Sequence, residues 1–418
     1  MLKLRGKVEV INPTKENPSL VFLTRNQDLA LPLRKRTALL IKSSDLENFY
    51  LKSIDELTSF SFASILFCGQ PLELEKIAQI AVRLNDVYYL PEDYSYLDEG
   101  DIVRLNPAGS TISAVFRKNA PNNSILLTER CNHLCLMCSQ PPKDVDDSWL
   151  LDEAFELVRM IPMDTVNIGF TGGEPTTYGE KFIELVNATK LALPNTSLDI
   201  LTNGRRFKNE AFAARLGRVK HPNLQLGIPI YSDDPVRHDY VVQAKGAFDE
   251  TIQGILNLKQ HGVRVEVRVV IHQQTLPRLV NLAEFIARNL LFVDHVALMG
   301  MEITGFTRAN LEILWVDPES YREKLSDAVE VLRSYGMNCS VYNHQLCLVN
   351  KDVEPAYKKS ISDWKNEYLP VCDECVRKSE CGGFFSTQIM FKHSDHISPF
   401  ILKNGIPVLR RSEVPSVN

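Results

Sequence analysis

Short apolar runs separated by turn-forming residues mark the first part of the chain. Runs of this length between turn signals predict β-strands. In the first 120 residues they lie at Gly6–Ile11, Ala38–Ile41, Phe62–Phe67, Val87–Leu90, Ile102–Leu105 and Thr111–Phe116. We therefore expect a β-rich N-terminal domain over residues 1–120.

From Ser124 onward, apolar runs alternate with segments whose apolar residues recur every three or four positions. The runs predict strands at Ile125–Thr128, Thr165–Phe170, Leu198–Leu201, Leu224–Ile230, Val263–Ile271 and Val293–Leu298. The amphipathic segments predict helices at Trp149–Ile161, Glu180–Ala192, Asn209–Leu216, Ala247–His261 and Leu276–Leu290. Such alternation favours right-handed crossovers and a parallel sheet. It predicts an α/β fold, an open partial (β/α)6 barrel, over residues 121–335.

Residues suited to binding or chemistry follow each of these six predicted strands. In strand order they are a cysteine triplet, Thr171–Pro175, Thr202–Gly204, Tyr231–Asp234, His272–Gln274 and Met299–Glu302. The active sites of (β/α) barrels are built at the carboxyl ends of the strands. We therefore expect one active site on this face of the barrel.

The cysteine triplet has the spacing C-x3-C-x2-C and consists of Cys131, Cys135 and Cys138. A four-iron, four-sulfur cluster usually takes four thiolates, so three of them leave one iron open for chemistry. A structural zinc site, or three unrelated thiols, are the alternatives.

Net charge, hydrophobic runs and the positions of the cysteines indicate what kind of protein this is. The net charge of −5 argues against broad nucleic-acid binding, and the sequence has no apolar run long enough for a membrane span. The basic N-terminus has no apolar segment after it, so we expect no signal peptide. Eight of the 9 cysteines lie beyond residue 130, mostly in metal-like groups, which indicates a reducing compartment. We expect a cytoplasmic protein.

The cysteine triplet and the segment Thr171–Pro175 resemble the radical S-adenosylmethionine (SAM) superfamily. That resemblance implies the same partial TIM barrel. It also implies that the open iron of a [4Fe-4S] cluster binds the amino and carboxylate groups of SAM. Reductive cleavage of SAM would then give a 5'-deoxyadenosyl radical. No individual residue of the chain is singled out as catalytic.

The resemblance also implies contacts to SAM. Gly172, Gly173 and Glu174 correspond to the amino-group segment, because two glycines allow close approach and a carboxylate accepts from an ammonium. The same Gly-Gly-Glu-Pro segment is also common in strand-to-helix turns. Met137 replaces an adenine-stacking residue that is often aromatic in the family, and Asn203 is a further candidate contact near the cluster.

Two more strands supply candidates. Ser232 and, second to it, Asp233 resemble the ribose-binding residues of peptide-modifying members, although a helix N-cap would use the same residue types. On the fifth strand, Arg268 is expected to pair with the SAM carboxylate. Arg264 is expected on the same face of the strand as Arg268, and we favour Arg268 because it lies nearer the strand end.

A second cysteine group, Cys372, Cys375 and Cys381, has the spacing C-x2-C-x5-C. It resembles the auxiliary [4Fe-4S] motif of peptide-modifying radical SAM enzymes, with Cys347 as the expected fourth ligand and Cys339 as its substitute. Zinc would accept the same four thiolates. We expect a C-terminal auxiliary-cluster domain over residues 336–395 and a tail over 396–418.

The whole layout resembles the His-Xaa-Ser system radical SAM maturases of the C type. This implies hydrogen abstraction from a ribosomally made precursor peptide with His-Xaa-Ser repeats. It also implies a sibling radical SAM maturase and a flavodoxin or ferredoxin as electron donor. One alternative is a small-molecule enzyme like the molybdopterin-precursor cyclase, and another is a non-catalytic iron–sulfur carrier. The bond that is made has no signature in the sequence.

Overall fold

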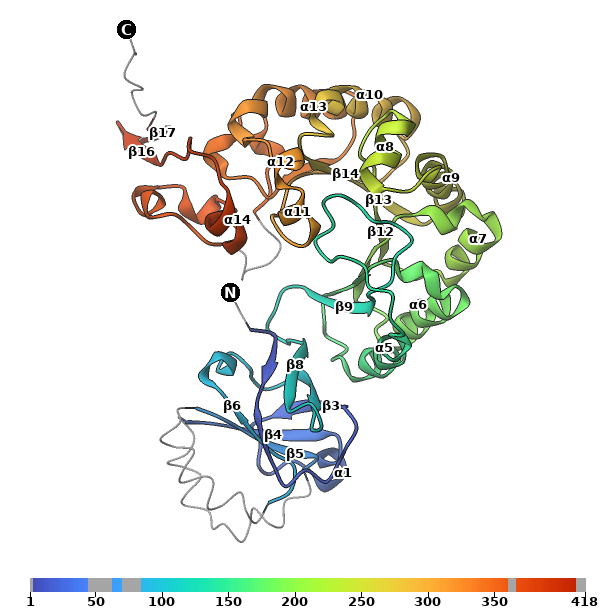
Figure 1. Cartoon of the computed structure of the whole chain (residues 1–418), viewed down its shortest axis with the longest axis vertical. Coiled ribbons are helices and arrows are strands. Elements are labelled where there is room, and N and C mark those ends of the chain that lie inside the picture. The colour runs from blue at the N-terminus through green and yellow to red at the C-terminus, as the bar shows by residue number, and fades with distance from the viewer. Residues whose placement is uncertain (1–2, 44–61, 70–83, 360–365, 411–418) are drawn as a thin grey trace. The chain divides into compact units, whose positions relative to one another are not determined.

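The computed structural model describes residues 3–43, 62–69, 84–359 and 366–410, and Figure 1 shows its elements. The chain divides into two compact units, which are described separately. Unit 1 comprises Met1–Ile125, Asp152–Val166 and Leu191–Thr196. Unit 2 comprises Leu126–Leu151, Asn167–Lys190 and Ser197–Asn418. Within the described part of the chain, no helix has the length and apolarity needed to cross a membrane.

Unit 1 is built on one mixed sheet of eight strands in the order β1-β8-β7-β3-β4-β5-β6-β2. The strands are β1 (Arg5–Lys7), β2 (Glu9–Ile11), β3 (Ser19–Thr24), β4 (Thr37–Lys42), β5 (Ser64–Cys68), β6 (Val87–Leu90), β7 (Ile102–Asn106) and β8 (Thr111–Phe116). Strands β3 to β6 run parallel, and the remaining pairs are antiparallel. The structure confirms the β-rich interpretation.

Two features of unit 1 differ from the prediction. The run Gly6–Ile11 breaks into two strands, because β1 pairs with β8 at one edge of the sheet and β2 pairs with β6 at the other. One short segment of chain therefore joins both edges, which bends the sheet into a half-barrel. Strand β3 was not predicted, although its run from Leu20 to Leu23 is continuously apolar.

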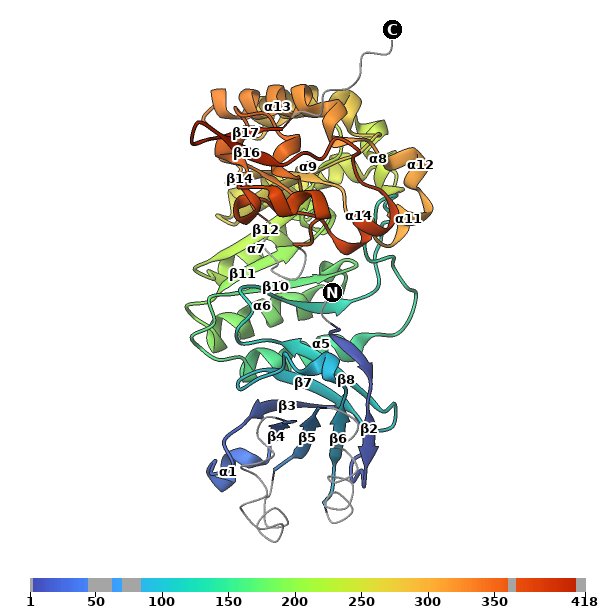
Figure 2. The same cartoon turned by 90° about the vertical axis from the view of Figure 1, so that its left-hand side faces the viewer.

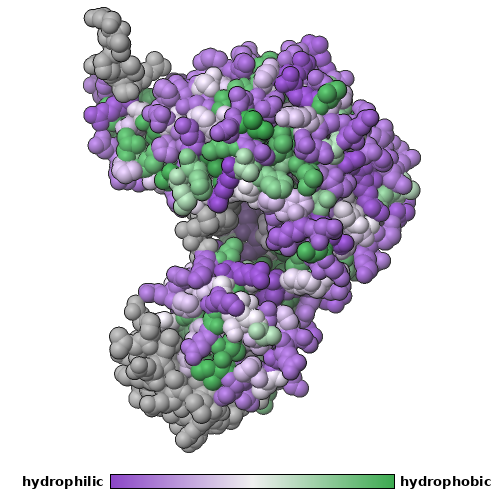
Figure 3. Space-filling model, in the orientation of Figure 1, coloured by the Kyte–Doolittle hydropathy of each residue, from purple (hydrophilic) through white to green (hydrophobic). Residues whose placement is uncertain are grey.

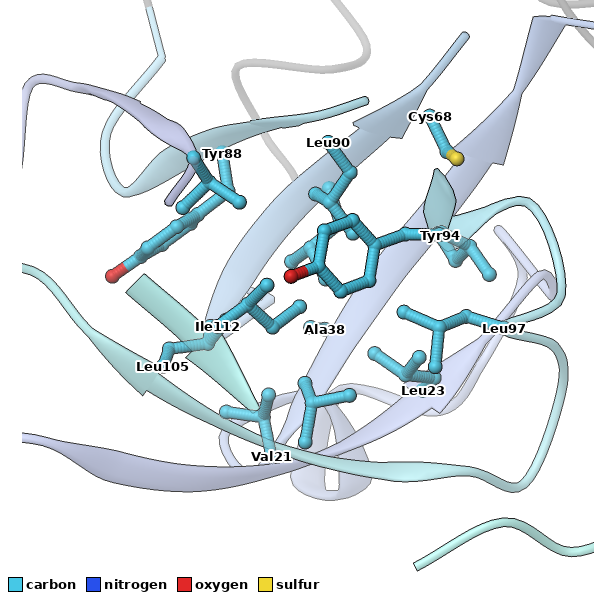
Figure 4. Packing of buried hydrophobic residues seen from close by; sticks show 14 residues of the cluster. Val21, Leu23, Ala38, Cys68, Tyr88, Leu90, Tyr94, Leu97, Leu105 and Ile112 are labelled. Carbon is cyan, nitrogen blue, oxygen red and sulfur yellow. The ribbon is translucent and has the colours of Figure 1, made fainter. Parts of the chain in front are cut away.

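Buried hydrophobic clusters lie on both faces of this sheet, and Figure 4 shows the larger one. Leu23, Ala38 and Tyr88 are buried there, and Ile112 packs beside them. Cys68 belongs to the same cluster with 5% of its surface exposed, and burial raises the pKa of its thiol to about 11. Cys68 is thus a small buried apolar side chain.

Unit 2 contains a parallel sheet in the order β15-β14-β13-β12-β11-β10-β9, which confirms the partial barrel. Its strands are β9 (Asn123–Thr128), β10 (Asn167–Gly172), β11 (Ser197–Leu201), β12 (Leu224–Pro229), β13 (Arg264–Ile271), β14 (His295–Gly300) and β15 (Cys339–Tyr342). Labels β10, β11, β12 and β14 follow one another upward in Figure 2. All six predicted strands are present, and β15 extends the sheet by a seventh.

Helices cover the outer face of this sheet (Figure 1). They include α6 (Glu180–Ala192), α7 (Glu210–Val219), α8 (Pro235–Val242), α9 (Ala247–Gln260), α10 (Leu279–Asn289) and α13 (Arg322–Ser334), whereas most of α5 (Ser148–Met160) belongs to unit 1. On β13, Val265, Val267 and Val269 are fully buried, whereas Glu266 and Arg268 alternate with them and are only half-buried. Hydrophilic side chains dominate the outside of the helical ring on the right of Figure 3.

Helices α8 and α13 were not predicted. Helix α8 begins at Pro235 after Asp234, whose Oδ1 accepts a 3.0 Å bond from the amide of Val236. Asp234 is therefore an N-cap, as its residue type allows. The shorter helices are α11 (Phe306–Ala309), α12 (Leu311–Leu314) and α14 (Ser386–Phe391). The expected tail contains a hairpin of β16 (Phe400–Lys403) and β17 (Ile406–Leu409).

Three buried histidines make the stability of unit 2 dependent on pH. Burial lowers the pKa of His238 to about 4, of His272 to about 3 and of His344 to about 4, from 6.5. Because the unfolded chain takes up these protons first, stability present above pH 6.5 is lost as the pH falls toward 4. Each histidine should cost about 1.4 kcal/mol at pH 5.5.

Urea unfolding at pH 7.5 and pH 5.5 measures this loss. The variant His272→Asn keeps an acceptor but cannot be protonated, so its loss of stability between these pH values should be smaller by the contribution of one histidine, about 1.4 kcal/mol. The matched control is His396→Asn, because His396 is exposed. Equal pH dependence in both variants would contradict the assignment.

Candidate functional site

The three cysteines of the triplet lie on a loop, residues 129–147, that follows β9 and that we call the cysteine loop. Its ends are tied together by the carboxylate of Asp147, which is 2% exposed. Thr128 Oγ1 donates to Asp147 Oδ2 at 2.9 Å, and the amide of Glu129 donates to the same oxygen. The hydroxyl of Tyr178 donates to Asp147 Oδ1 at 3.2 Å. A buried carboxylate thus closes the loop through several donors.

The middle of the cysteine loop is held from both sides. The amide of Leu136 donates to the carbonyl of Val241 on α8 at 2.9 Å. Asn310 Nδ2 donates to the Leu136 carbonyl at 2.8 Å. Gly305 has a φ of +53°, and a Cβ there would lie 2.3 Å from the carbonyl oxygen of Cys138. Glycine is required at this position because the loop backbone passes so close.

The thiols of Cys131, Cys135 and Cys138 are near enough to affect one another. Burial, followed by the charges of Glu174 and Cys138, raises the pKa of Cys131 to about 11. Burial, followed by the charges of Cys131 and Cys138, also raises the pKa of Cys135. The amide of His133 donates to Cys131 Sγ at 3.4 Å. The loop therefore places three thiols together in a largely buried setting.

Gly172 and Gly173 allow the end of β10 to lie against the start of the cysteine loop. A Cβ on Gly172 would lie 2.3 Å from the Thr128 carbonyl oxygen, and one on Gly173 would lie 2.1 Å from that of Arg130. The amides of Gly173 and Glu174 donate to these two carbonyls at 2.8 Å each. The close approach that requires glycine here is to the chain's own loop.

Glu174 is 1% exposed, and donors of the chain surround its carboxylate. Oε1 accepts from the Thr176 amide at 3.0 Å and from Thr202 Oγ1 at 2.7 Å. Oε2 accepts from the Asn203 amide at 2.6 Å. Burial raises the pKa of the Glu174 carboxyl, although these donors favour its ionised form. In the structure this carboxylate joins the end of β10 to the end of β11.

Asn203 and Met137 lie at the cysteine loop. Asn203 Nδ2 donates to Asn132 Oδ1, inside the triplet, at 2.6 Å. Met137 packs with Tyr231 and Met301 in one apolar cluster. These two predicted residues are thus brought to the thiols.

The remaining predicted residues have partners within the chain. Ser232 is fully buried, and its Oγ accepts from the Asp234 amide at 3.1 Å. Asp233 forms a two-point ion pair with Arg278, with Nε and Oδ1 2.7 Å apart. Arg268 Nε lies 3.3 Å from Glu266 Oε1 on the same strand.

Sequence reasoning missed Asp147 and Arg278 as parts of this region, and it assigned no individual role to Thr202. Thr202 belongs to the Thr-Asn-Gly segment that follows the third predicted strand, so its position was a usable signal. Asp147 and Arg278 act on residues 19 and 45 positions away, and no local pattern marks them.

The second cysteine group lines one cavity of about 370 Å³ in unit 2, and the cavity wall includes Cys347, Cys372, Cys375 and Cys381. Cys339 is not in this wall and lies on β15 instead. Of the two candidates for a fourth thiol, the structure brings Cys347 to the group.

Backbone amides donate to the sulfurs of this cavity. Leu346 and Gly383 donate to Cys381 Sγ at 3.3 and 3.4 Å, and Phe400 donates to Cys375 Sγ at 3.4 Å. Such N–H···S bonds stabilise thiolates and tune iron–sulfur clusters. Phe400 lies in the segment expected to be a tail, so that segment contributes to the cavity.

Comparison with known proteins identifies the barrel. Residues 125–286 match the model of the Radical SAM superfamily, so this part of the chain is a radical SAM domain. A probable GTP 3',8-cyclase of Methanocella arvoryzae is 30% identical over 134 residues, which cover 31% of this chain and 41% of that relative. The GTP 3',8-cyclase of Mycobacterium sp. (strain KMS) is 25% identical over 179 residues, 40% of this chain and 49% of the relative. The chain thus spans under half the length of these relatives.

Solved structures give weaker matches. SuiB of Streptococcus suis bound to S-adenosylmethionine has a TM-score of 0.44 and 14% identity, over 72% of this chain and 61% of SuiB. The enzyme anSMEcpe with bound AdoMet has a TM-score of 0.41 and 16% identity, over 52% of this chain and 62% of that one. We draw no argument from similarities of this size.

The variant Glu174→Ala tests the role of the buried carboxylate. It leaves the Thr202 hydroxyl and the Asn203 amide without an acceptor, which should lower the free energy of unfolding by about 3 kcal/mol. Urea unfolding of the metal-free protein measures this, with the exposed Glu184→Ala as control. Unchanged stability combined with weaker SAM binding would instead assign the carboxylate to the ligand.

Proposed function

We propose that the chain is a radical SAM enzyme that modifies a peptide. The observation that carries the proposal is the cysteine loop, which holds three half-buried thiols at the carboxyl ends of the barrel strands. Three thiolates are one ligand short of a full set for a four-iron cluster, so one iron would remain open for SAM. When bound, the cluster would supply the electron that cleaves SAM to a deoxyadenosyl radical.

In this proposal the residues around the loop position SAM. Cys131, Cys135 and Cys138 would hold the cluster, and Met137 would pack on adenine from the apolar cluster that it shares with Tyr231. Asn203 is already at the loop through Asn132. Because the Glu174 carboxylate is occupied by chain donors, we assign the amino group of SAM to the backbone carbonyls of residues 172–174.

The ribose and carboxylate contacts need rearrangement of existing pairs. Asp233 would have to share its carboxylate with Arg278 or release it. Ser232 accepts from a backbone amide, which leaves its hydroxyl proton for a second partner. Arg268 would bind the SAM carboxylate in competition with Glu266, which leaves Ser232 as the less hindered of these contacts.

We propose that the cavity of Cys347, Cys372, Cys375 and Cys381 holds an auxiliary four-iron cluster. Three N–H···S bonds to Cys375 and Cys381 would stabilise these sulfurs as thiolate ligands of the cluster. The auxiliary motif and the segment from Tyr231 to Asp239 resemble those of peptide-modifying enzymes, which is why a precursor peptide, of the His-Xaa-Ser type, is the proposed substrate. A sibling maturase and a flavodoxin or ferredoxin donor belong to the same proposal.

A second candidate function is a small-molecule cyclisation. The 30% identity to the probable GTP 3',8-cyclase of Methanocella arvoryzae favours it. That identity covers 31% of the chain. The similarity is therefore an argument about the SAM-binding domain more than about the substrate.

Iron content tests the two metal assignments. The anaerobically reconstituted protein should contain about eight irons per chain, four in each cluster. Replacing Cys131, Cys135 and Cys138 by alanine should remove half of the iron and all SAM cleavage. Cys347→Ala should reduce the auxiliary iron, and Cys339→Ala should not. One zinc and four irons per chain would exclude the auxiliary cluster but not the cluster of the cysteine loop.

Isotope transfer tests the substrate class. Deoxyadenosine formed with a deuterated precursor peptide should carry deuterium, since the radical abstracts hydrogen from its substrate. The control reaction uses deuterated GTP with the same protein, SAM and reductant. Label from the nucleotide and none from any peptide would favour the cyclase candidate.

A further inference from the structure

A second cavity of unit 2, which we call the mouth cavity, lies at the carboxyl ends of β13, β14 and β15. Its volume is about 410 Å³, part of which is open to solvent. Its wall includes Ile271 and Gly300, the last residues of β13 and β14, and Asn343, which follows β15. Trp315 and the C-terminal residues Gln388 and Lys392 complete it. Strand carboxyl ends are where barrel enzymes bind their substrates.

The mouth cavity is next to both groups of cysteines. Met301 lines the mouth cavity and also belongs to the apolar cluster that contains Met137. Cys135 of the triplet packs against this cluster. On its other side, Gln345 and Phe384 line both the mouth cavity and the cavity of the second cysteine group. A molecule in the mouth cavity would therefore lie between the two groups of thiols.

The fixed charge in the wall of the mouth cavity is of one sign. No Asp or Glu lines the mouth cavity, and Lys392 is its one residue with a fixed charge. The Lys392 ammonium lies 4.8 Å from the centre of the Trp315 ring. Lys392 is exposed, and within the described residues it has no carboxylate partner. Because the Lys392 ammonium is exposed to water, its contact with the half-buried Trp315 ring is weak, and the ammonium can pair with an arriving anion.

Other polar side chains of the wall already have hydrogen-bond partners within the chain. Gln388 Nε2 donates to the Met301 carbonyl at 3.2 Å, and Gln345 Nε2 donates to the Gly383 carbonyl at 2.9 Å. His393 Nδ1 donates to the carbonyl of Ser394 at 3.0 Å, because a carbonyl can only accept. Lys392 is thus the group best placed to take a charged ligand.

We propose that the mouth cavity binds a carboxylate of the peptide substrate, and that Lys392 leaves the Trp315 ring to pair with it. The inference rests on the proposed peptide-modifying function and adds the chemistry that selects the peptide. The carboxylate can be an Asp or Glu side chain, or the C-terminus of the peptide. A charge-assisted bond to a point cation such as lysine suits either source.

Affinity selection without turnover tests this. The reconstituted protein, with SAM and no reductant, is mixed with an equimolar library of synthetic hexapeptides whose C-termini are amidated, and with the same library carrying free C-termini. Retained peptides are identified by mass spectrometry. The variants are Lys392→Gln, Lys392→Arg and, as a control on exposed β16, Lys403→Gln.

Retention of acidic members of the amidated library would assign a side-chain carboxylate. Retention only from the free-acid library would assign the C-terminus. In either case Lys392→Gln should reduce retention about tenfold. The variants Lys392→Arg and Lys403→Gln should retain the peptides about as well as the unchanged protein. Equal retention of neutral peptides, no retention at all, or no effect of Lys392→Gln would overturn the inference. None of these outcomes depends on SAM cleavage, so label transfer from a peptide could still succeed.

Discussion

The backbone contact between the end of β10 and the start of the cysteine loop fixes the position of the three thiols. Residues 128 and 130 present carbonyl oxygens to the amides of Gly173 and Glu174 at 2.8 Å. Any side chain at positions 172 or 173 would collide with those oxygens. Because the loop cannot lie this close to a residue with a Cβ, two glycines are a condition for placing the cysteines over the sheet.

A second constraint acts through buried carboxylates. Asp147 closes the cysteine loop at its base, and Glu174 joins β10 to Thr202 and Asn203 beyond β11. Both are nearly inaccessible to water, so each is stable as an anion only where several donors meet it. Asn203 then reaches back to Asn132 in the loop. The polar contacts therefore form one continuous path from the third strand of the barrel to the first.

The sequence predicted the barrel well because parallel strands covered by helices are continuous apolar runs, as in β13, where Val265, Val267 and Val269 are buried. It missed β15, whose four residues Cys339–Tyr342 are too few and too mixed to stand out. It missed α8 because the polar stretch before this helix was interpreted as a binding motif in preference to a helix N-cap. Helix α8 is stabilised by packing of Val241 and Val242, which its propensity does not reveal.

The site was predictable in position but not in detail. Counting residues after each strand located Cys131, Glu174 and Asn203, because strand ends share one face. Their partners could not be predicted, since an ion pair such as Asp233 with Arg278 joins residues 45 positions apart. The same limit explains Lys392, which lies in a polar segment without any motif. Only the fold brings it to Trp315, so this contact depends on packing that local sequence does not encode.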